Sequence, residues 1–515
     1  MEITTNLAND LRVILRSATW LWPEVTLAAG LVVLLLTDLV MRKKRGGLFV
    51  GMLLLTVLTS GYFLLQQWDL LSVDESLPRF LNTLLVDRLA VYLKLLFSFA
   101  LFFVGLMSLR TYSGSQQIGF ERLDRIGEYY IMLLGVALGA SLMVSTTHLL
   151  TIYLAIELVS LSSYVLANFN FDRKSAEASM KYVLYGSAAS GLMLYGMSLL
   201  YGLTGTLLLT ETAFLEGLQA APPLLSSLAI GLTISGFLFK ISAVPFHVWV
   251  PDIYEGVPTP VAAFFSVVPK IAGVGLLLRV APVLFFSTPY FPGEWLLGLI
   301  AMVTMIAGNV AALHQTNAKR MLAYSSIAHS GFLLAGVLVA KGWGLYNVLF
   351  YATVYLVMNL AAFWLIKLLG ERTKSYQIAD YRGLGLRFPA LGIAMLLVMI
   401  ALTGLPPTAG FTAKLFIFSA LWDAYQQTLE PQLLYVFVVG LFNTVISLFY
   451  YLKIPYYLFF KNTPDRTEST ISTSPTYSSQ FSGKFGTFLL IIPLLLLFFK
   501  ADWLLAIISQ IISVP

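Results

Sequence analysis

Long apolar segments recur along almost the whole chain. A segment of about 18 or more residues with few charges is long enough to cross the hydrocarbon core of a bilayer as a helix. Only 11% of the 515 residues are charged, whereas a soluble domain carries roughly 25%. Lipid offers no partner to backbone polar groups, so each segment must satisfy its own hydrogen bonds as a helix. The sequence therefore predicts an all-α polytopic membrane protein.

We expect fourteen transmembrane helices. Their predicted bounds are 20–41, 47–66, 88–109, 127–146, 149–168, 179–203, 224–247, 254–280, 294–314, 321–340, 344–369, 390–422, 432–460 and 485–511. Lys and Arg are enriched in cytoplasmic loops. Eighteen of these residues lie in loops that follow odd-numbered spans, and six lie on the other side with the two termini. Both termini are therefore expected on the non-cytoplasmic side.

The residues that bind most cofactors are missing from the sequence. The chain has no cysteine, which excludes disulfides, thiol chemistry and iron–sulfur ligation by this chain. Its four histidines lack the spacing of a metal site such as H-E-x-x-H, and neither a G-x-G-x-x-G nor a Walker A pattern is present. We therefore expect no cofactor and no metal on this chain.

Eight basic residues fall inside the predicted spans. Arg279, Lys367 and Lys453 lie near span ends, where a long side chain reaches the interface. Lys94 lies farther inside its span, and we expect it to pair with Asp87 or to reach the interface. These four positions do not by themselves indicate a function.

The other four basic residues are more informative. Lys240, Lys270 and Lys414 lie deep in their spans or at a break, and Lys181 lies near the start of span six. A charge at mid-membrane costs at least ~2.5–3.5 kcal/mol on insertion scales. Burial disfavours the charged form of an amine, so a buried Lys exchanges its proton more readily than a surface Lys. These residues are candidate proton carriers; a structural ion pair across helices is the alternative for each.

Glu157 is the only acidic residue in the interior of its span. Lys181 begins the next span, so a helical hairpin brings the two side chains within reach of each other. An opposite charge nearby favours both ionised forms, and separating the two would remove that stabilisation. The sequence thus predicts a switchable Glu157–Lys181 pair, with a lone structural ion pair as the alternative.

Two spans are interrupted by Pro and Gly. Pro245 and Pro251 follow Lys240, and just before Lys414 the chain contains Gly404, Pro406, Pro407 and Gly410. Pro removes a backbone donor and clashes with the preceding turn, so both helices should break. Carbonyl groups freed by a break can stabilise a nearby ammonium group. A packing kink is the alternative at each site.

The two breaks lie five spans apart, which predicts two inverted five-helix repeats. We divide the chain accordingly. Residues 1–126 hold an interfacial N-terminus and spans one to three, 127–280 the first repeat (spans four to eight), 294–460 the second repeat (spans nine to thirteen), and 461–515 a flexible Ser-, Thr- and Pro-rich loop with span fourteen.

His329 lies on span ten, between the Lys240–Lys270 region and Lys414. Because imidazole titrates near neutral pH, His329 is a candidate link between these lysines. A hydrogen-bonded packing role is nearly as well supported. His247 is expected to be structural or an entrance group.

The stretches PFHVWVPDIYEGVPTPVAAFFSVVPK, QTNAKRMLAYSSIAHSGF and GLPPTAGFTAK closely resemble the antiporter-like subunits of respiratory complex I, NADH-quinone oxidoreductase. The resemblance implies a proton-pumping subunit of the membrane arm, built from two inverted five-helix repeats. It would make Glu157 and Lys181 the conformationally switched pair and Lys240 the central carrier. Lys270 would be the connecting residue and Lys414 the outer carrier.

Among the three antiporter-like types, Lys414, the length and the lack of a long lateral helix after span fourteen resemble subunit N, or subunit 2. The resemblance implies a non-redox translocase subunit in a bacterial inner (cytoplasmic) membrane. FMN, iron–sulfur clusters and quinone are then expected in partner subunits. The expected partners are a neighbouring antiporter-like subunit, small membrane subunits and the lipid bilayer, with no nucleic acid.

Other functions remain open from the sequence. A subunit of a multisubunit cation/proton antiporter, or of a membrane-bound hydrogenase-type pump, shares the spans and the buried lysines. A membrane scaffold without transport would tolerate replacement of the buried lysines by Met. An autonomous quinone enzyme lacks any cofactor motif here.

Overall fold

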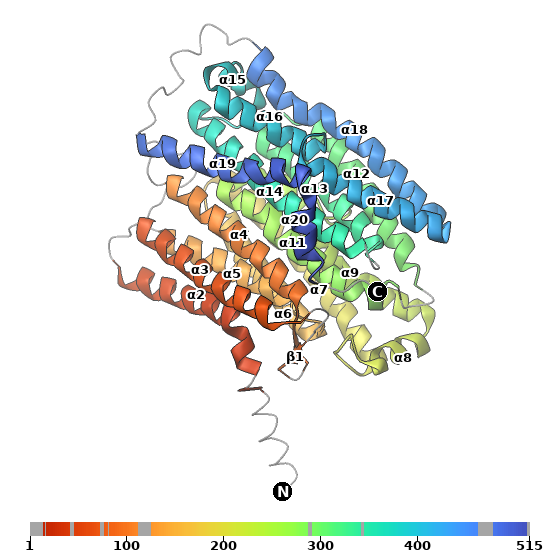
Figure 1. Ribbon diagram of the computed structural model, residues 1–515. Helices are drawn as coiled ribbons and strands as arrows, with labels where there is room; N and C mark the ends of the chain where they lie inside the picture. The colour runs from red at the N-terminus through yellow and green to blue at the C-terminus, as the bar shows by residue number, and fades with distance from the viewer. Residues whose placement is uncertain are drawn as a thin grey trace.

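Helices make up nearly all of the described chain (Figure 1). The computed structural model describes residues 14–15, 17–41, 46–72, 77–80, 82–111, 125–286, 291–340, 344–461 and 477–511. Most of the predicted interfacial N-terminus and of the predicted loop at 461–484 lies outside these residues.

The helices follow one another through short connections. The first half contains η1 (Thr19–Leu21), α2 (Trp22–Val40), α3 (Gly46–Leu70), α4 (Arg88–Thr111), α5 (Ile126–Met143), α6 (Leu149–Ala167), α7 (Arg173–Thr204), α8 (Thr212–Ala220), α9 (Pro223–Ile241), α10 (Trp249–Gly256) and α11 (Thr259–Leu284). The second half contains α12 (Gly293–Leu313), α13 (Ala318–Leu338), α14 (Gly344–Thr373), η3 (Ile378–Tyr381), α15 (Leu384–Arg387), α16 (Pro389–Thr403), α17 (Ala409–Thr428), α18 (Pro431–Phe460), α19 (Tyr477–Phe499) and α20 (Ala501–Ile508). An antiparallel hairpin of β1 (Leu77–Arg79) and β2 (Leu84–Val86) is the one departure from the all-α prediction within the described residues.

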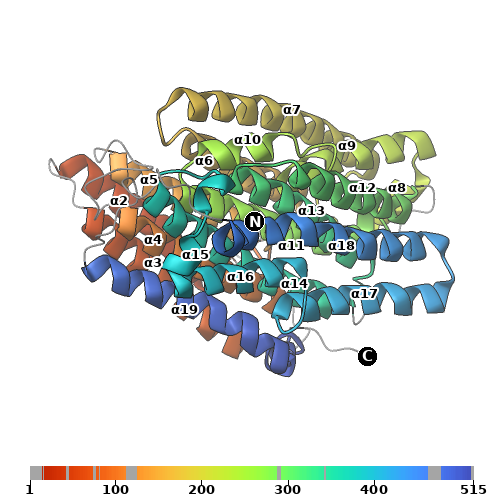
Figure 2. The same ribbon diagram turned by 90° about the horizontal axis from the view of Figure 1, so that it is seen from above.

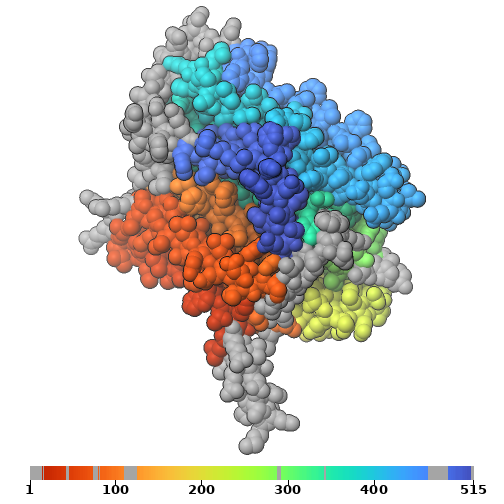
Figure 3. Space-filling view, in the orientation of Figure 1, coloured from red at the N-terminus to blue at the C-terminus, as the bar shows by residue number. Residues whose placement is uncertain are grey.

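The predicted membrane spans agree with the helices. Within the described residues, twelve helices are long and apolar enough to cross a membrane, and each corresponds to one predicted span. The predicted span at 390–422 is divided into α16 and α17. The predicted span at 485–511 is α19 followed by α20, with a bend of 89° between them. This bent pair lies across the front of the bundle (Figure 3).

Three helices form the interior of the bundle. We compare the most apolar 18-residue stretch of each helix. In α11, α13 and α14, 94% of that stretch is buried, compared with 33% in α18 and 22% in the segment that contains α2. Both ribbon views place α2 and α3 at one end of the molecule and α17 and α18 at the other (Figures 1 and 2). The central helices are therefore shielded from lipid by their neighbours, and polar groups on them find protein partners instead.

Both predicted helix breaks are confirmed. α9 ends at Ile241, where Ser242 adopts a left-handed conformation, and the chain resumes as α10 at Trp249. α16 ends at Thr403, Gly404 has φ +84°, and α17 begins at Ala409. Each break therefore interrupts the regular helical hydrogen bonding, so the last carbonyl groups of a half-helix inside the bundle take partners from outside it.

Candidate functional site

Lys240 lies in the last turn of α9, at the first helix break. Its side chain is 1% exposed, and its Nζ atom has no hydrogen-bond partner among the described residues. The predicted stabilisation by freed carbonyl groups is therefore not seen here. The carboxylate of Glu157 acts electrostatically on Lys240, and the negative end of α9 also favours a cation. Its Nζ atom lies 5.8 Å from the ring centre of Phe239, so within the described residues Lys240 is a buried amine stabilised only by contacts longer than a hydrogen bond.

Lys270 lies in the middle of the interior helix α11 and is fully buried. Its ammonium group donates to the Ser326 carbonyl and hydroxyl oxygens, both at 2.9 Å, and to the Ser330 hydroxyl at 3.3 Å. All three acceptors belong to α13, the helix that carries His329. The ammonium group is solvated by neutral oxygens and has no ion pair within the described part of the chain.

The second helix break binds Lys414 directly. Its Nζ atom donates to the Thr403 carbonyl oxygen at 2.7 Å, at the C-terminal end of α16. The same ammonium group lies 4.8 Å from the ring centre of Phe332. Here the freed carbonyl does stabilise the amine, as predicted, and the helix dipole favours the same charge. The stem of Lys414 also packs against Gly404, where a Cβ atom would lie 2.7 Å from the lysine Cδ.

His329 lies between Lys270 of the first half and Lys414 of the second half. Its Nδ1 atom is 2.6 Å from the Tyr351 hydroxyl, and its Nε2 atom is 3.0 Å from the Tyr451 hydroxyl. Both Lys270 and Lys414 act electrostatically on its ring. Its hydrogen bonds fit the packing role and its position fits the linking role, so both predicted roles remain open.

Ser326, Tyr351 and Tyr451 were not predicted as site residues. Ser, Thr and Tyr are common in all the spans, so residue type alone did not single them out. For Ser326 the sequence holds one weak signal. Ser326 and Ser330 lie four residues apart and therefore share a face of α13.

The predicted contact between Glu157 and Lys181 is not found. Lys181 instead forms ion pairs with Asp252 at 3.0 Å and Glu177 at 2.9 Å, and its side chain is 43% exposed. The Oε1 atom of Glu157 is buried without a hydrogen-bond partner among the described residues. In this structure α10 brings an acidic residue to Lys181 from a later part of the chain, and the switching of Lys181 toward Glu157 stays a prediction.

Two other predicted side-chain environments are corrected. Lys94 pairs with Glu24 at 2.5 Å, not with Asp87, and both side chains are buried. Asp87 is instead bound by both terminal nitrogens of Arg279, at 2.8 and 2.6 Å. Arg279, near the end of α11, is therefore held in a largely buried two-point ion pair. Neither pair contacts Lys240, Lys270, His329 or Lys414 through a hydrogen bond or ion pair among the described residues.

The geometry brings most of the predicted residues into two electrostatic groups. Glu157 and Lys240 form the first, and Lys270, His329 and Lys414 form the second. The two groups are neighbours at α11. Gly273 lies one turn from Lys270 on this helix, and a Cβ atom added to Gly273 would lie only 3.6 Å from the Cβ atom of Lys240. A row of buried amines, separated by hydroxyl groups and an imidazole, is suited to transferring protons.

Comparison with known proteins identifies the class. Residues 146–447 match the family model described as "NADH:quinone oxidoreductase/Mrp antiporter, TM". This region is more than half of the chain and contains all six candidate residues. The chain therefore belongs to the family of antiporter-like membrane subunits of NADH:quinone oxidoreductases and Mrp antiporters.

The relatives place it within that family. NADH-quinone oxidoreductase subunit N of Anaeromyxobacter sp. (strain Fw109-5) is 41% identical over 463 residues, covering 85% of this chain and 87% of the relative. The chloroplastic NAD(P)H-quinone oxidoreductase subunit 2 of Mesostigma viride is 38% identical, covering 86% and 85%. The match is to the subunit N type, an antiporter-like subunit of the complex I membrane arm.

Solved structures agree with this placement. A chain of respiratory complex I from Thermus thermophilus, solved with bound aureothin, superposes with a TM-score of 0.75 at 30% identity, covering 94% of this chain and 98% of that chain. A chain of the Mrp complex from Dietzia sp. superposes with a TM-score of 0.79 at 20% identity, covering 97% and 98%. At that identity the second match indicates the fold alone.

Proposed function

We propose that this chain moves protons through its line of buried charges while electron transfer takes place in other subunits. The observation that carries the proposal is Lys240, a fully buried amine without a hydrogen-bond partner among the described residues. An unneutralised charge in this position is costly to retain, so a group that gains and loses a proton there is favoured over a fixed cation.

The proposed order follows the electrostatic contacts. Glu157 stabilises the protonated form of Lys240 when Lys181 is distant from it. Movement of Lys181 toward Glu157 takes this stabilisation away, and the Lys240 proton then passes toward Lys270. His329 continues the path to Lys414, since both lysines act on its ring. Repulsion between like charges lowers the proton affinity of each amine in turn.

We further propose that the chain takes no part in redox chemistry, and that FMN, iron–sulfur clusters and quinone belong to partner subunits. Its neighbours would be another antiporter-like subunit and small membrane subunits. The proposed location is a bacterial inner membrane with both termini on the non-cytoplasmic side. The absence of cysteine from the sequence supports the assignment of iron–sulfur ligation to other chains.

The two-repeat organisation, 127–280 and 294–460, is also proposed. Three pairs of features, each five spans apart, support it. α6 and α13 begin at residues whose side chains cap the helix, His148 and Asn317. Each capping residue forms an isolated antiparallel bridge with a later loop, His148 with Leu208 and Asn317 with Gln377. The two helix breaks recur at the same offset.

Replacing Lys240 by Met in the complete complex tests the proposal. Met removes the charge and nearly preserves the volume of the side chain, so we expect the complex to assemble but proton translocation to be lost. The measurement is the number of protons moved per electron pair in proteoliposomes. Lys453→Met is the matched control, because Lys453 lies near the end of α18 and donates only to the Gln315 carbonyl oxygen among the described residues.

A normal proton-to-electron ratio in the assembled Lys240→Met complex would refute the proposal and favour a scaffold without transport. Loss of pumping in the Lys453→Met control as well would show that the assay reports a general disturbance of the membrane part rather than the role of Lys240.

A further inference from the structure

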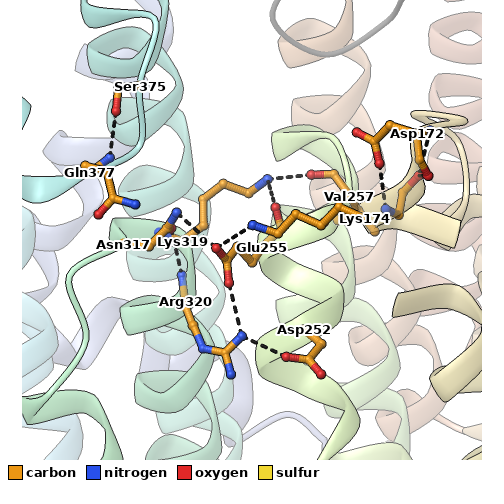
Figure 4. Close-up of polar contacts among 12 residues, drawn as sticks. Asp172, Lys174, Asp252, Glu255, Val257, Asn317, Lys319, Arg320, Ser375 and Gln377 are labelled. Carbon is orange, nitrogen blue, oxygen red and sulfur yellow. Dashed lines mark hydrogen bonds and ion pairs between the residues drawn. The ribbon is translucent and has the colours of Figure 1, made fainter. Parts of the chain in front are cut away.

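A cluster of six charged side chains joins three helices on the side predicted to be cytoplasmic; Figure 4 labels all of them except Lys181. We call it the ionic cluster; its members are Lys174 and Lys181 on α7, Asp252 and Glu255 on α10, and Lys319 and Arg320 on α13. The proposed proton path uses only Lys181 from this set. The cluster is also the point at which the first half of the chain is tied to the second by charge.

Asp252 is shared between two cations from different halves of the chain. Its Oδ2 atom accepts a hydrogen bond from Lys181 Nζ at 3.0 Å, and its Oδ1 atom accepts one from Arg320 Nη1 at 2.7 Å. α7 and α13 therefore meet through one carboxylate. Any change in the position of Lys181 alters the charge that faces Arg320.

Glu255 repeats this arrangement one turn farther along α10. It accepts from Lys174 at 2.6 Å through Oε1 and from Arg320 at 3.0 Å through Oε2. Lys319, which is 3% exposed, donates to the backbone carbonyl oxygens of Glu255 and Val257. Figure 4 shows the Lys319 side chain reaching across to the end of α10. The two carboxylates thus bind three cations, Lys174, Lys181 and Arg320, so these cations compete for them.

Both carboxylates are stabilised in their ionised form. Burial raises the pKa of Asp252, but hydrogen bonds from Arg320 and Lys181 outweigh burial and lower this pKa overall. Burial likewise raises the pKa of Glu255, and hydrogen bonds from Lys174 and Arg320 lower it overall. Neither residue lies in one of the membrane-spanning helices.

We propose that Asp252 is a positioning residue for the Lys181 switch: it holds the ammonium group away from Glu157 and competes with Glu157 for it. This inference rests on the proposed function. Glu157 has a buried oxygen without a hydrogen-bond partner among the described residues, while Lys181 is held by Asp252 and Glu177. The long lysine stem allows the ammonium group to change partners without moving the helix.

The competition has a direct consequence for the second half of the chain. When Lys181 leaves for Glu157, Asp252 faces Arg320 alone and attracts it more strongly. Arg320 lies in the first turn of α13, and the same helix supplies Ser326, which binds Lys270. Movement of Lys181 thereby changes the electrostatic attraction that acts on the start of α13, and this effect does not involve Lys240. The two halves are coupled by one shared carboxylate.

The test uses the complete purified complex with Asp252→Asn. The amide retains the shape but removes the charge, so Lys181 should move to Glu157. A cryo-EM map of the variant complex should then place Lys181 Nζ within hydrogen-bond distance of Glu157. Protons moved per electron pair should fall by about fivefold, the lower range of coupling between linked sites. Asp252→Glu, which restores the charge, should recover most of the ratio.

Glu177→Gln is the matched control. Glu177 binds Lys181 at nearly the same distance as Asp252 does, but it is 66% exposed and has no ion pair with α13 in the part of the chain that the structure describes. We expect this variant to lose less of the proton-to-electron ratio than Asp252→Asn, because Lys181 keeps Asp252, which also binds Arg320. If Asp252→Asn fails to assemble, Arg320→Gln serves instead, because it leaves Asp252 to Lys181 alone and should keep Lys181 in its present position.

Two outcomes would overturn the inference. One is an Asp252→Asn complex, or an Arg320→Gln complex, in which Lys181 takes the position opposite to that expected. The other is an equal loss of pumping in Glu177→Gln and Asp252→Asn. Neither outcome affects the proposed function, which fails only if Lys240→Met leaves pumping intact. The two proposals are therefore tested separately.

Discussion

The second helix break depends on Gly404, so replacing Gly404 by Ala should disturb Lys414 without changing any charge. Gly404 has φ +84°, and an added Cβ atom would lie 2.7 Å from Lys414 Cδ. A side chain in the left-handed region costs roughly 1–2 kcal/mol. If the lysine stem moves away, its ammonium group also loses the hydrogen bond to the Thr403 carbonyl oxygen.

The expected magnitude follows from these two effects. A hydrogen bond to a charged group contributes about 1.5–3 kcal/mol. The smaller sum of backbone strain and lost hydrogen bond is on the order of 2.5 kcal/mol, by which Gly404→Ala should destabilise the second helix break. Proton transfer to Lys414 should fall accordingly, because the acceptor is no longer in place.

The assay has two parts, native-gel quantification of the assembled complex and protons moved per electron pair in proteoliposomes. Gly231→Ala on α9 is the matched control, because no atom lies within 4 Å of an added Cβ there and φ is not in the left-handed region. Ala in a helix interior is even favoured over Gly by about 1 kcal/mol. A Gly404→Ala complex that assembles and pumps as well as this control would refute the reasoning.

Two further predictions concern ion pairs. Lys94→Met leaves the buried Glu24 carboxylate unpaired, which costs about 3–5 kcal/mol, so the amount of assembled complex should fall. Adding Glu24→Gln should restore much of the assembly. A double variant that assembles as poorly as Lys94→Met alone would contradict this prediction. The lowered pKa of Asp252 means that its stabilising contribution is present above its unfolded pKa and lost as pH falls through its folded pKa. The difference in thermal stability between the wild-type and Asp252→Asn complexes should therefore shrink only below about pH 4; a change between pH 6 and 8 would argue against it.

The sequence by itself determined the class of fold and the chemistry of the candidate site. Apolar length predicted the spans, because a helix must be long enough to cross the membrane whatever it packs against. Pro245 and Gly404 predicted the two breaks, since their effects on the backbone are local. Lys240, Lys270 and Lys414 were recognisable because buried charges are rare in apolar segments.

Only the tertiary structure decided which groups meet. Lys181 lies with Asp252 instead of Glu157, and Lys94 lies with Glu24 instead of Asp87. The sequence does not reveal such pairs, because lipid is as apolar as the protein interior and the hydrophobic pattern does not fix how each helix is rotated. The rotation is set by close packing between helices distant in sequence. That packing decides whether a buried amine meets a carboxylate, a carbonyl oxygen or no partner at all.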